Sequence, residues 1–374
     1  MSWPEGWLRL RDRCLSSERF QAWASRSPLA GILARRNASE LFDLCAGFVY
    51  SQILLASVEL GLLELVREEP LTRAQLSERL GLAAARAERL IDAAIALKLL
   101  QRRSGGRRVG LGQRGAMLLG NPAVLALVRH HHLLYRDLAD PAALLRQPVS
   151  GTALRDYWAY ARQEFPARLA GPRTDGYSEL MAASQPLIAR QVLDAYPLHD
   201  HRDLLDVGGG LGEFALAAAR RAPHLTCRVF DLPAVAERAQ TRFEAEGLAG
   251  RLRAIGGSFL TDPLPRNADL VCLVRVLHDH DDPVVLHLLR AIRTALAPGG
   301  ALLIAEPMSE AGTARVSDAY FGFYLLAMGQ GRTRTVEQLT ALLVQSGFCA
   351  PRRIPTRIPL QCQVIVSSMN VNAA

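Results

Sequence analysis

The C-terminal half of the chain alternates short apolar runs with longer amphipathic stretches, and this alternation restricts the possible fold more than any other feature. Four apolar runs have the length of buried parallel strands: residues 204–207, 226–230, 270–274 and 301–305. Three intervening stretches are expected to be helices: residues 214–221, 235–246 and 283–296. The sequence therefore predicts a doubly wound α/β sheet with helices on both faces.

The length and composition fit a globular protein of two domains. A chain of 374 residues has room for two domains of ordinary size. Hydrophobic residues make up 49% of it and charged residues only 21%, which favours a buried core over extensive disorder. The six cysteines form no CxxC pair, so the sequence suggests neither a disulfide framework nor a zinc site and fits a cytoplasmic protein.

No stretch reaches the roughly 18 uncharged apolar residues expected of a membrane-spanning helix. The nearest candidate, residues 41–66, is interrupted by Asp43, Gln52, Glu59 and Glu64. The net charge of +8 would permit attraction to anionic lipid or to nucleic acid, but it does not choose between them.

Residues 1–36 have a basic amphipathic pattern, with Trp3, Trp7 and Trp23 among seven arginines and only three acids. Such a segment can lie on a membrane surface, with its aromatic side chains at the level of the lipid headgroups. The pattern favours packing against a partner subunit or the chain itself, because most amphipathic helices bury their apolar stripe in protein. Both interpretations remain open from the sequence.

Residues 71–111 have a winged-helix pattern. Thr72 can cap a short helix, Gly81 makes a turn, a second helix follows over residues 86–100, and residues 104–106 form the tip of a hairpin. A DNA-binding protein can be built this way. However, the second helix is mostly apolar and has few side chains that could read bases, which favours a dimerisation domain.

Residues 121–196 are expected to be mainly helical and broken into segments by prolines. The breaks are expected at Pro122, Pro141, Pro148, Pro166, Pro172 and Pro186.

A glycine-rich turn follows the first predicted strand. Glycines at positions 208, 209, 210 and 212 allow a tight turn and a close approach of backbone to a ligand. Asp231, at the end of the next predicted strand, could accept hydrogen bonds from ribose hydroxyls. Residues 210–215 also satisfy a GxGxxA dinucleotide fingerprint. Two features favour a sulfonium cofactor with an amino-acid tail over a dinucleotide with its pyrophosphate. They are Asp206 before the glycines and the turn at residues 298–300.

Five segments together resemble a known family: residues 206–212, 230–233, 256–259 and 275–279, and Glu306. They are similar to the class I S-adenosylmethionine-dependent O-methyltransferases that include the plant caffeate and flavonoid enzymes. Within that family, residues 42–52, 157–160 and 256–265 resemble the hydroxycarotenoid enzymes of photosynthetic bacteria.

The resemblance covers nearly the whole chain and implies its organisation. Residues 1–120 would form a mostly helical winged-helix dimerisation region, so a homodimer is expected. Residues 121–196 would be a helical linker that contributes to the acceptor pocket. Residues 197–374 would form a Rossmann-like domain that binds S-adenosylmethionine.

The resemblance also implies which residues bind this methyl donor. Gly208 and Gly210 would line its methionine end, and Asp231 would hold the ribose. The residues that would flank the adenine are Leu232, Ser258 and Phe259. Arg275 stands where the plant enzymes have lysine and is assigned to the same site, whereas Ser258 replaces their aspartate.

His278 matches the general base of the family, and Glu306 matches the carboxylate that orients its imidazole. A carboxylate on one ring nitrogen fixes the tautomer and stabilises the imidazolium that forms when the other nitrogen takes a proton. Alternatively, His278 and Asp279 merely cap the helix that begins near residue 283. The plant enzymes have a second glutamate near Thr333 or Arg334, where this chain has no acid, so Glu306 acts alone or Asp279 assists.

Two histidine clusters raise the question of a metal. Residues 130–132 are three consecutive histidines, which point in different directions on a helix and cannot all ligate one ion. Residues 278–282 offer better ligand types. Because the resemblance is to metal-independent enzymes, no catalytic metal is expected.

The hydroxycarotenoid resemblance implies a carotenoid acceptor, methylated at the tertiary C1 hydroxyl of an acyclic hydroxycarotenoid. Aromatic residues that could line a polyene tunnel, or simply fill a core, are Tyr160, Tyr320, Phe321, Phe323 and Tyr324. A carotenoid acceptor implies a role in carotenoid biosynthesis and photosynthesis, with the enzyme in the cytoplasm or peripheral at the photosynthetic membrane. The alternatives are a phenol or a chlorophyll-type pigment as acceptor, or a winged-helix DNA-binding regulator.

Overall fold

The computed structural model describes residues 5–27, 30–146, 151–158, 172–309, 315–359 and 362–369. The chain divides into two compact units, Met1–Gly120 and Asn121–Ala374, each described here by itself.

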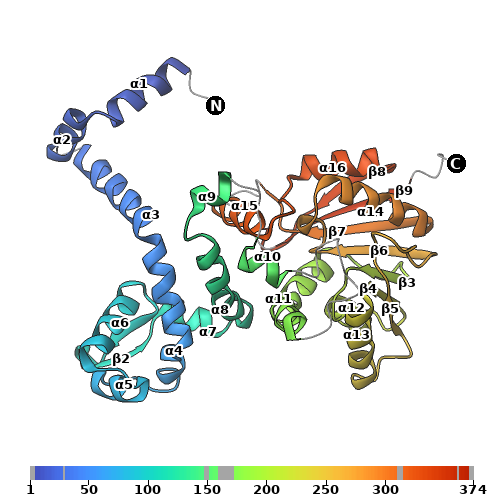
Figure 1. Ribbon diagram of the computed structural model, residues 1–374, viewed down its shortest axis with the longest axis horizontal. Coiled ribbons are helices and arrows are strands. Elements are labelled where there is room, and N and C mark those ends of the chain that lie inside the picture. Colours follow the sequence, from blue (N-terminus) through green and yellow to red (C-terminus); the bar gives the residue numbers. More distant parts are fainter. Residues whose placement is uncertain are drawn as a thin grey trace. The chain divides into compact units, whose positions relative to one another are not determined.

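The N-terminal unit is helical, with one small hairpin (Figure 1). Its helices are α1 (Glu5–Leu15), α2 (Glu18–Arg26), α3 (Ala30–Glu59), α4 (Leu62–Leu65), α5 (Arg73–Leu80), α6 (Ala84–Ala96) and α7 (Gln113–Leu119). The antiparallel strands β1 (Leu100–Arg103) and β2 (Arg108–Leu111) flank the 3-10 turn η1 (Ser104–Gly106).

The predicted winged-helix pattern is confirmed within this unit. Thr72 and Gln75 form a capping box at the start of α5, and Gly81 ends that helix in the left-handed conformation. The second helix is shorter than predicted, because Lys98 adopts a φ of 61° and the chain then enters β1. The apolar residues after position 96 therefore belong to a turn and a strand.

Helix α3 has a more apolar surface than the sequence interpretation allowed. By length and composition alone it could cross a membrane, with an 18-residue window of mean hydropathy 1.6. Only 17% of that window is buried, and exposed residues such as Phe42, Leu44 and Phe48 form an apolar face. An apolar helix near the N-terminus that lies open within one protomer is also what a subunit interface requires.

The C-terminal unit is built on a seven-stranded sheet of order β5-β4-β3-β6-β7-β9-β8. Its strands are β3 (Asp203–Val207), β4 (Thr226–Asp231), β5 (Leu252–Gly256), β6 (Ala268–Val274), β7 (Leu296–Glu306), β8 (Phe348–Ile354) and β9 (Gln363–Met369). The first five strands in this order are parallel, whereas β9 pairs antiparallel with both β7 and β8. The predicted doubly wound α/β fold is confirmed, and strands β5, β8 and β9 were not predicted.

Helices cover both faces of the sheet (Figure 1). One face carries α11 (Pro172–Ala195) and α12 (Glu213–Arg221), and α13 (Pro233–Ala245) packs beside β5 and β4. The opposite face carries α14 (Asp282–Ala295) and α16 (Val336–Gln345). The remaining helices are α8 (Pro122–Asp137), α9 (Pro141–Arg146), α10 (Ala153–Tyr157) and α15 (Arg315–Met328).

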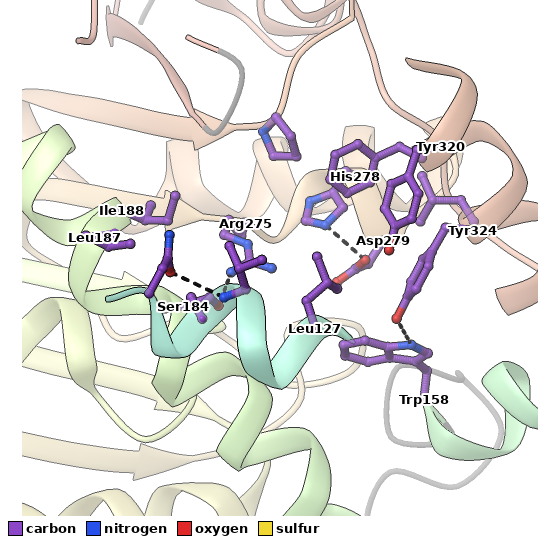
Figure 2. Close-up of a pocket in the computed structure, with 16 residues that line it drawn as sticks. Leu127, Trp158, Ser184, Leu187, Ile188, Arg275, His278, Asp279, Tyr320 and Tyr324 are labelled. Atoms are coloured by element: carbon purple, nitrogen blue, oxygen red, sulfur yellow. Dashed lines mark hydrogen bonds and ion pairs between the residues drawn. The ribbon is translucent and has the colours of Figure 1, made fainter. Parts of the chain in front are cut away.

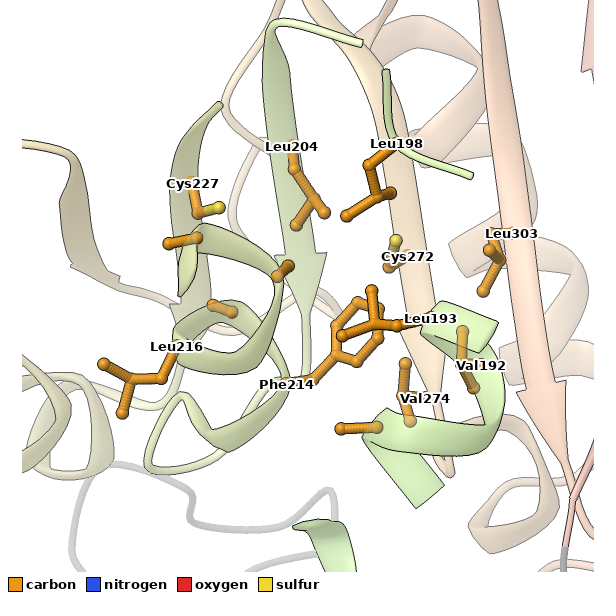
Figure 3. Packing of buried hydrophobic residues seen from close by; sticks show 14 of the residues in the cluster. Val192, Leu193, Leu198, Leu204, Phe214, Leu216, Cys227, Cys272, Val274 and Leu303 are labelled. Carbon is orange, nitrogen blue, oxygen red and sulfur yellow. The ribbon is translucent and has the colours of Figure 1, made fainter. Parts of the chain in front are cut away.

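The central strands read as continuous apolar runs because they are buried on both faces. In β6, Leu270 and Cys272 point into the cluster beneath α11 and α12, whereas Val271 and Leu273 point into the cluster beneath α14 and α16. Figure 3 shows the first cluster around Phe214. Full burial of one such aliphatic or aromatic side chain stabilises the fold by about 1.5–3 kcal/mol.

The expected break at Pro186 is wrong, since α11 continues through this residue. Pro186 removes one backbone donor, but Ile188, Ala189 and Val192 on the next turns are buried in the sheet cluster. Their burial keeps the helix continuous. Pro122, Pro141 and Pro172 do begin helices, while Pro148 and Pro166 lie outside the described residues.

Candidate active site

The glycine-rich turn joins β3 to α12 and is open at its centre. Gly208, Gly210 and Gly212 have φ values of 70°, 59° and 74°, which strain any residue with a Cβ atom. A Cβ at Gly208 would lie 2.9 Å from Cγ2 of Val276, so the Val276 side chain packs directly on the Gly208 backbone. At Gly210, no described atom lies within 4 Å of the corresponding position. The turn therefore leaves room for a ligand beside Gly210.

Asp231 ties the glycine turn to the end of β4. Its Oδ2 accepts a hydrogen bond from the backbone of Gly210 at 2.8 Å, and its Oδ1 accepts one from Leu232 at 2.7 Å. Burial raises the pKa of Asp231, and the two backbone donors oppose that rise. Each carboxylate oxygen retains a lone pair with which it can accept a hydrogen bond from a ligand.

Asp206 is a buried carboxyl group beneath the same turn. It is only 1% exposed, and neither oxygen has a hydrogen-bond partner among the described residues. Burial and the nearby Asp231 raise the pKa of Asp206 to about 8. Because buried polar groups are almost always paired, this carboxyl suits a site where a ligand or an ordered water supplies a donor.

The three residues assigned to the adenine lie in loops at the carboxyl ends of β4 and β5, which are neighbours in the sheet. Leu232 directly precedes α13. The backbone N–H of Ser258 donates to Asp262 at 2.8 Å, and the Phe259 ring packs edge-on against the His280 ring with 5.4 Å between centroids. This contact links the loop after β5 to the segment that carries His278.

His278 and Glu306 form a buried pair at the carboxyl ends of β6 and β7. Nδ1 of His278 lies 2.5 Å from Oε2 of Glu306, and the residues are 8% and 2% exposed. The other oxygen of Glu306 accepts hydrogen bonds from the backbone N–H groups of Val276 and Leu277, at 2.7 and 2.6 Å. Glu306 therefore fixes both the imidazole and the turn that carries it.

A second carboxylate reaches the other side of the imidazole. Oδ1 of Asp279 lies 3.3 Å from Nε2 of His278. Burial lowers the pKa of His278, but the negative charges of Asp279 and Glu306 outweigh it, so the pKa is raised overall. His278 and Asp279 lie in the 3-10 turn η4 (Leu277–Asp279), ahead of the N-cap residue Asp281 of α14, so neither occupies that cap position.

Arg334 occupies the region where the sequence lacks the second glutamate of the plant enzymes. Its guanidinium, only 2% exposed, donates to the carbonyl oxygens of Leu277 at 2.8 Å and His280 at 2.7 Å, and it pairs with Asp282. A Cβ at Gly331 would lie 2.3 Å from the carbonyl oxygen of His278. The loop before α16 thus supports the backbone of the His278 turn, which nothing in its sequence indicated.

A cavity of about 300 Å³ opens beside His278. The polar side chains in its lining, apart from the aromatic ones, are Asn121, Ser184, Arg275, His278 and Asp279. The rest of the lining is mainly apolar or aromatic and comes largely from α8, α11 and α15, including Val124, Leu127, Leu187, Ile188, Phe321 and Leu325. In Figure 2, His278 and Asp279 lie between Leu187 and Ile188 on one side and Tyr320 and Tyr324 on the other.

Arg275 belongs to the lining of this cavity. It adopts a φ of 60°, and its Nη1 donates a hydrogen bond to Oγ of Ser184 at 2.6 Å (Figure 2). Tyr320, Phe321 and Tyr324, three of the aromatic residues singled out in the sequence, also line the cavity. Phe323 is 38% exposed, and Tyr160 lies outside the described residues.

The two histidine clusters do not converge on a metal site in the described part of the chain, where no group of three or more His, Cys, Asp or Glu side chains is placed to hold an ion. His130 and His131 instead contact Tyr324 and Tyr320.

Comparisons with known proteins identify the family. Residues 142–349 match the O-methyltransferase domain, and residues 42–121 match the O-methyltransferase dimerisation domain. The second match spans the exposed face of α3 and supports a homodimer.

Two bacterial relatives match almost the full length of the chain. The demethylspheroidene O-methyltransferase of Cereibacter sphaeroides is 43% identical over 97% of this chain and 95% of its own. The enzyme of the same name from Rhodobacter capsulatus is 40% identical over 96% of this chain and 89% of its own.

Solved structures agree. Human N-acetylserotonin methyltransferase in complex with S-adenosylmethionine is 25% identical, with a TM-score of 0.74 over 89% of this chain and 98% of its own. A methyltransferase of calicheamicin biosynthesis has the same fold, with 24% identity and a TM-score of 0.75 over 90% of this chain and 98% of its own. Of the classes that the glycine-rich turn and the winged helix left open, these matches select the methyltransferase. The chain belongs to the S-adenosylmethionine-dependent O-methyltransferase family.

Proposed function

We propose that this enzyme methylates the tertiary C1 hydroxyl of an acyclic hydroxycarotenoid. The observation that carries the proposal is the cavity beside His278, which combines a buried base with a largely apolar and aromatic lining. Such a lining suits a hydroxyl on a hydrocarbon. The names of the two bacterial relatives, which act on demethylspheroidene, support the same acceptor class.

The cavity volume restricts how such an acceptor would bind. About 300 Å³ is at the lower end of the range for small-molecule sites, which is roughly 300–1,000 Å³. A carotenoid is longer than such a space, so its hydroxyl-bearing end would enter while the remaining polyene extends outward. A phenol or a chlorophyll-type pigment is the alternative acceptor, and the experiment below distinguishes the three.

The residues around the glycine turn fit S-adenosylmethionine. The open space beside Gly210 would take the methionine end, together with Gly208, and the free lone pairs of Asp231 would accept the ribose hydroxyls. Leu232, Ser258 and Phe259 would flank the adenine. Arg275 would stand where this site meets the acceptor cavity. When bound, S-adenosylmethionine supplies an electrophilic methyl group, whose bond to sulfur breaks on transfer so that S-adenosylhomocysteine leaves.

His278 would act as the general base. The Glu306 carboxylate can only accept a hydrogen bond, so Nδ1 of His278 carries the proton that lies between them. Nε2 is then the nitrogen that takes the proton of the acceptor hydroxyl as the new O–C bond forms. Asp279 and Glu306 would stabilise the resulting imidazolium from its two sides. An aliphatic alcohol is far less acidic than a phenol, so its proton must leave during the attack.

The test is a panel of acceptors with methyl-labelled S-adenosylmethionine. Hydroxylated acyclic carotenoids, chlorophyllides and simple phenols are each incubated with the purified enzyme, and label in each product is counted. Label in the 1-hydroxycarotenoid above the other classes supports the proposal. Label mainly in phenols or chlorophyllides contradicts it.

Residues 1–36 are proposed to bring the enzyme to the membrane that holds such an acceptor. Exposed apolar side chains on α1 and α2, including Trp7, Leu10 and Trp23, accompany the excess of arginine in this segment. An anionic bilayer would attract the arginines and accept the aromatic rings at its surface. The enzyme would then be cytoplasmic and peripheral at the photosynthetic membrane.

Deletion of residues 1–36 tests this assignment. Methylation of carotenoid in anionic vesicles should fall, whereas methylation of detergent-dispersed carotenoid should persist. A triple Arg9→Gln, Arg11→Gln, Arg13→Gln variant, which keeps the aromatic residues, should show the same selective loss at low salt, because it removes three charges that would attract an anionic bilayer. Equal loss in vesicles and detergent would instead assign the segment to packing on the partner subunit.

A further inference from the structure

Two tyrosines of the cavity wall have their hydroxyls bound by histidines. Tyr320 and Tyr324 lie four residues apart on α15 and therefore share one face of that helix. The Tyr324 hydroxyl lies 2.7 Å from Nε2 of His130, and the Tyr320 hydroxyl lies 2.8 Å from Nε2 of His131. Neither histidine is among the described residues that line the cavity. The wall thus consists of tyrosine rings whose hydroxyls are engaged elsewhere.

The hydrogen-bond directions around Tyr324 follow from its partners. The indole N–H of Trp158 can only donate, and it lies 2.8 Å from the Tyr324 oxygen (Figure 2). With one lone pair engaged by Trp158, the Tyr324 hydroxyl can donate its own proton to Nε2 of His130. Burial, followed by the charges of His131 and His132, lowers the pKa of His130 to about 4, so its ring is neutral at pH 7 and able to accept.

The Tyr320 pair follows the same pattern in a less buried place. Burial lowers the pKa of His131, so its neutral ring offers one accepting nitrogen to the Tyr320 hydroxyl. The third consecutive histidine differs. His132 is exposed, and its Nδ1 contacts the carbonyl oxygen of Arg129 in its own helix. Two of the three histidines thus serve the cavity wall, and the third provides a matched control.

We propose that His130 and His131 are specificity-determining residues of the acceptor cavity. By holding the hydroxyls of Tyr324 and Tyr320, they keep this wall apolar, and the cavity favours an alcohol on a plain hydrocarbon over one with a second polar group. The inference rests on the proposed function, in which the acceptor is an apolar alcohol. Without its histidine, a tyrosine hydroxyl would turn to the cavity. A bound hydrocarbon would leave this hydroxyl without a hydrogen-bond partner, whereas a bound molecule with a second polar group would provide one.

The test uses the Tyr320 pair and two small probes. The probes are a C10 isoprenoid tertiary alcohol and a diol of the same skeleton with a second hydroxyl in mid-chain. Their dissociation constants are measured by calorimetry on the full chain with S-adenosylhomocysteine present. The wild type should bind the mono-alcohol about tenfold more tightly than the diol, by analogy with other polar-for-apolar discriminations. His131→Leu should remove most of this preference.

Two further variants separate the freed hydroxyl from general damage. The His131→Leu/Tyr320→Phe double variant has no hydroxyl to release, so it should recover the wild-type preference. His132→Leu should bind the mono-alcohol in preference to the diol, as the wild type does. If His131→Leu does not fold, His131→Ala replaces it as the single variant, and His131→Ala/Tyr320→Phe replaces it as the double variant.

The inference is overturned if the wild type shows no preference, if the single variant keeps it, or if the double variant does not recover it. These results are independent of methyl transfer. If the wild type prefers the mono-alcohol but labels no carotenoid, the carotenoid proposal fails and the role of the histidines stands.

Discussion

Glu306 binds His278 and the turn that carries His278 at the same time. One carboxylate oxygen lies 2.5 Å from Nδ1 of the imidazole, while the other accepts the backbone N–H groups of Val276 and Leu277. The orientation of the imidazole and the shape of its turn therefore depend on one side chain at the end of β7.

Glu306→Gln should impair turnover more than acceptor binding. Glutamine can still accept from the two backbone groups, but it loses the charge that stabilises the imidazolium. We expect kcat to fall by about 100-fold or more, which is typical for the loss of general base catalysis, with a small change in acceptor KM. Glu246→Gln, which alters an ion pair with Arg220 outside the site, is the matched control. An unchanged kcat in Glu306→Gln would remove Glu306 from the mechanism.

The acid limb of the pH profile should lie above pH 6.5. Burial lowers the pKa of His278, but the charges of Asp279 and Glu306 raise it by more than burial lowers it. Only the unprotonated imidazole can accept a proton. Activity should therefore rise with pH through this raised pKa. Asp279→Asn removes one of the two charges and should move the acid limb of kcat/KM to lower pH. The same limb in both proteins would show that Asp279 does not act on His278.

Asp231→Asn should weaken the binding of S-adenosylmethionine. The replacement loses a charged acceptor that holds Gly210 and Leu232 and, in the proposed site, the ribose hydroxyls. The dissociation constant should rise about 10- to 100-fold, as expected for hydrogen bonds to a charged group. Calorimetry with S-adenosylhomocysteine measures it. The control is Asp203→Asn, because Asp203 pairs with Arg228 at the end of β3 away from the glycine turn. This variant should bind S-adenosylhomocysteine normally. Equal effects in both variants would count against Asp231 as a ligand of the ribose.

Arg334→Leu should destabilise the protein by about 1.5–3 kcal/mol, because it removes the guanidinium donor from the carbonyl oxygen of His280 and one of the two donors to that of Leu277. Arg332→Leu removes an exposed partner of the same Asp282 and should cost at most about 1 kcal/mol. Urea unfolding of both variants gives the comparison. Similar losses would mean that burial of Arg334 contributes nothing beyond its surface ion pair.

The central sheet could be predicted because burial on both faces leaves a simple signal. Strands β3, β4, β6 and β7 are short apolar runs, and their order placed Asp231, His278 and Glu306 at one edge. The outer strands β5 and β8 carry exposed arginines such as Arg253 and Arg352, so their sequences lack that signal. The end of α6 was missed for a different reason, since apolar residues continue to Leu100 but the left-handed backbone of Lys98 follows the end of the helix.

The pairing of His278 with Glu306 was expected from the sequence through the family resemblance, and the structure places the two residues after neighbouring parallel strands. The contacts that surround this pair were not expected. Arg334 reaches the His278 turn from a loop more than 50 residues away, and Ser184 reaches Arg275 from α11. The tyrosine–histidine pairs likewise join α8 to α15. Such contacts depend on how helices pack on the sheet, which no local pattern encodes.

One experiment tests the acceptor and the base together. A 1-hydroxycarotenoid is incubated with methyl-labelled S-adenosylmethionine and either the wild type or His278→Ala, and the position of the transferred methyl group is determined. We expect label as an ether at the tertiary C1 oxygen with the wild type, and a rate at least about 100-fold lower with the variant. Label at another position would rule out the proposed acceptor hydroxyl, and an equal rate in His278→Ala would rule out the proposed base.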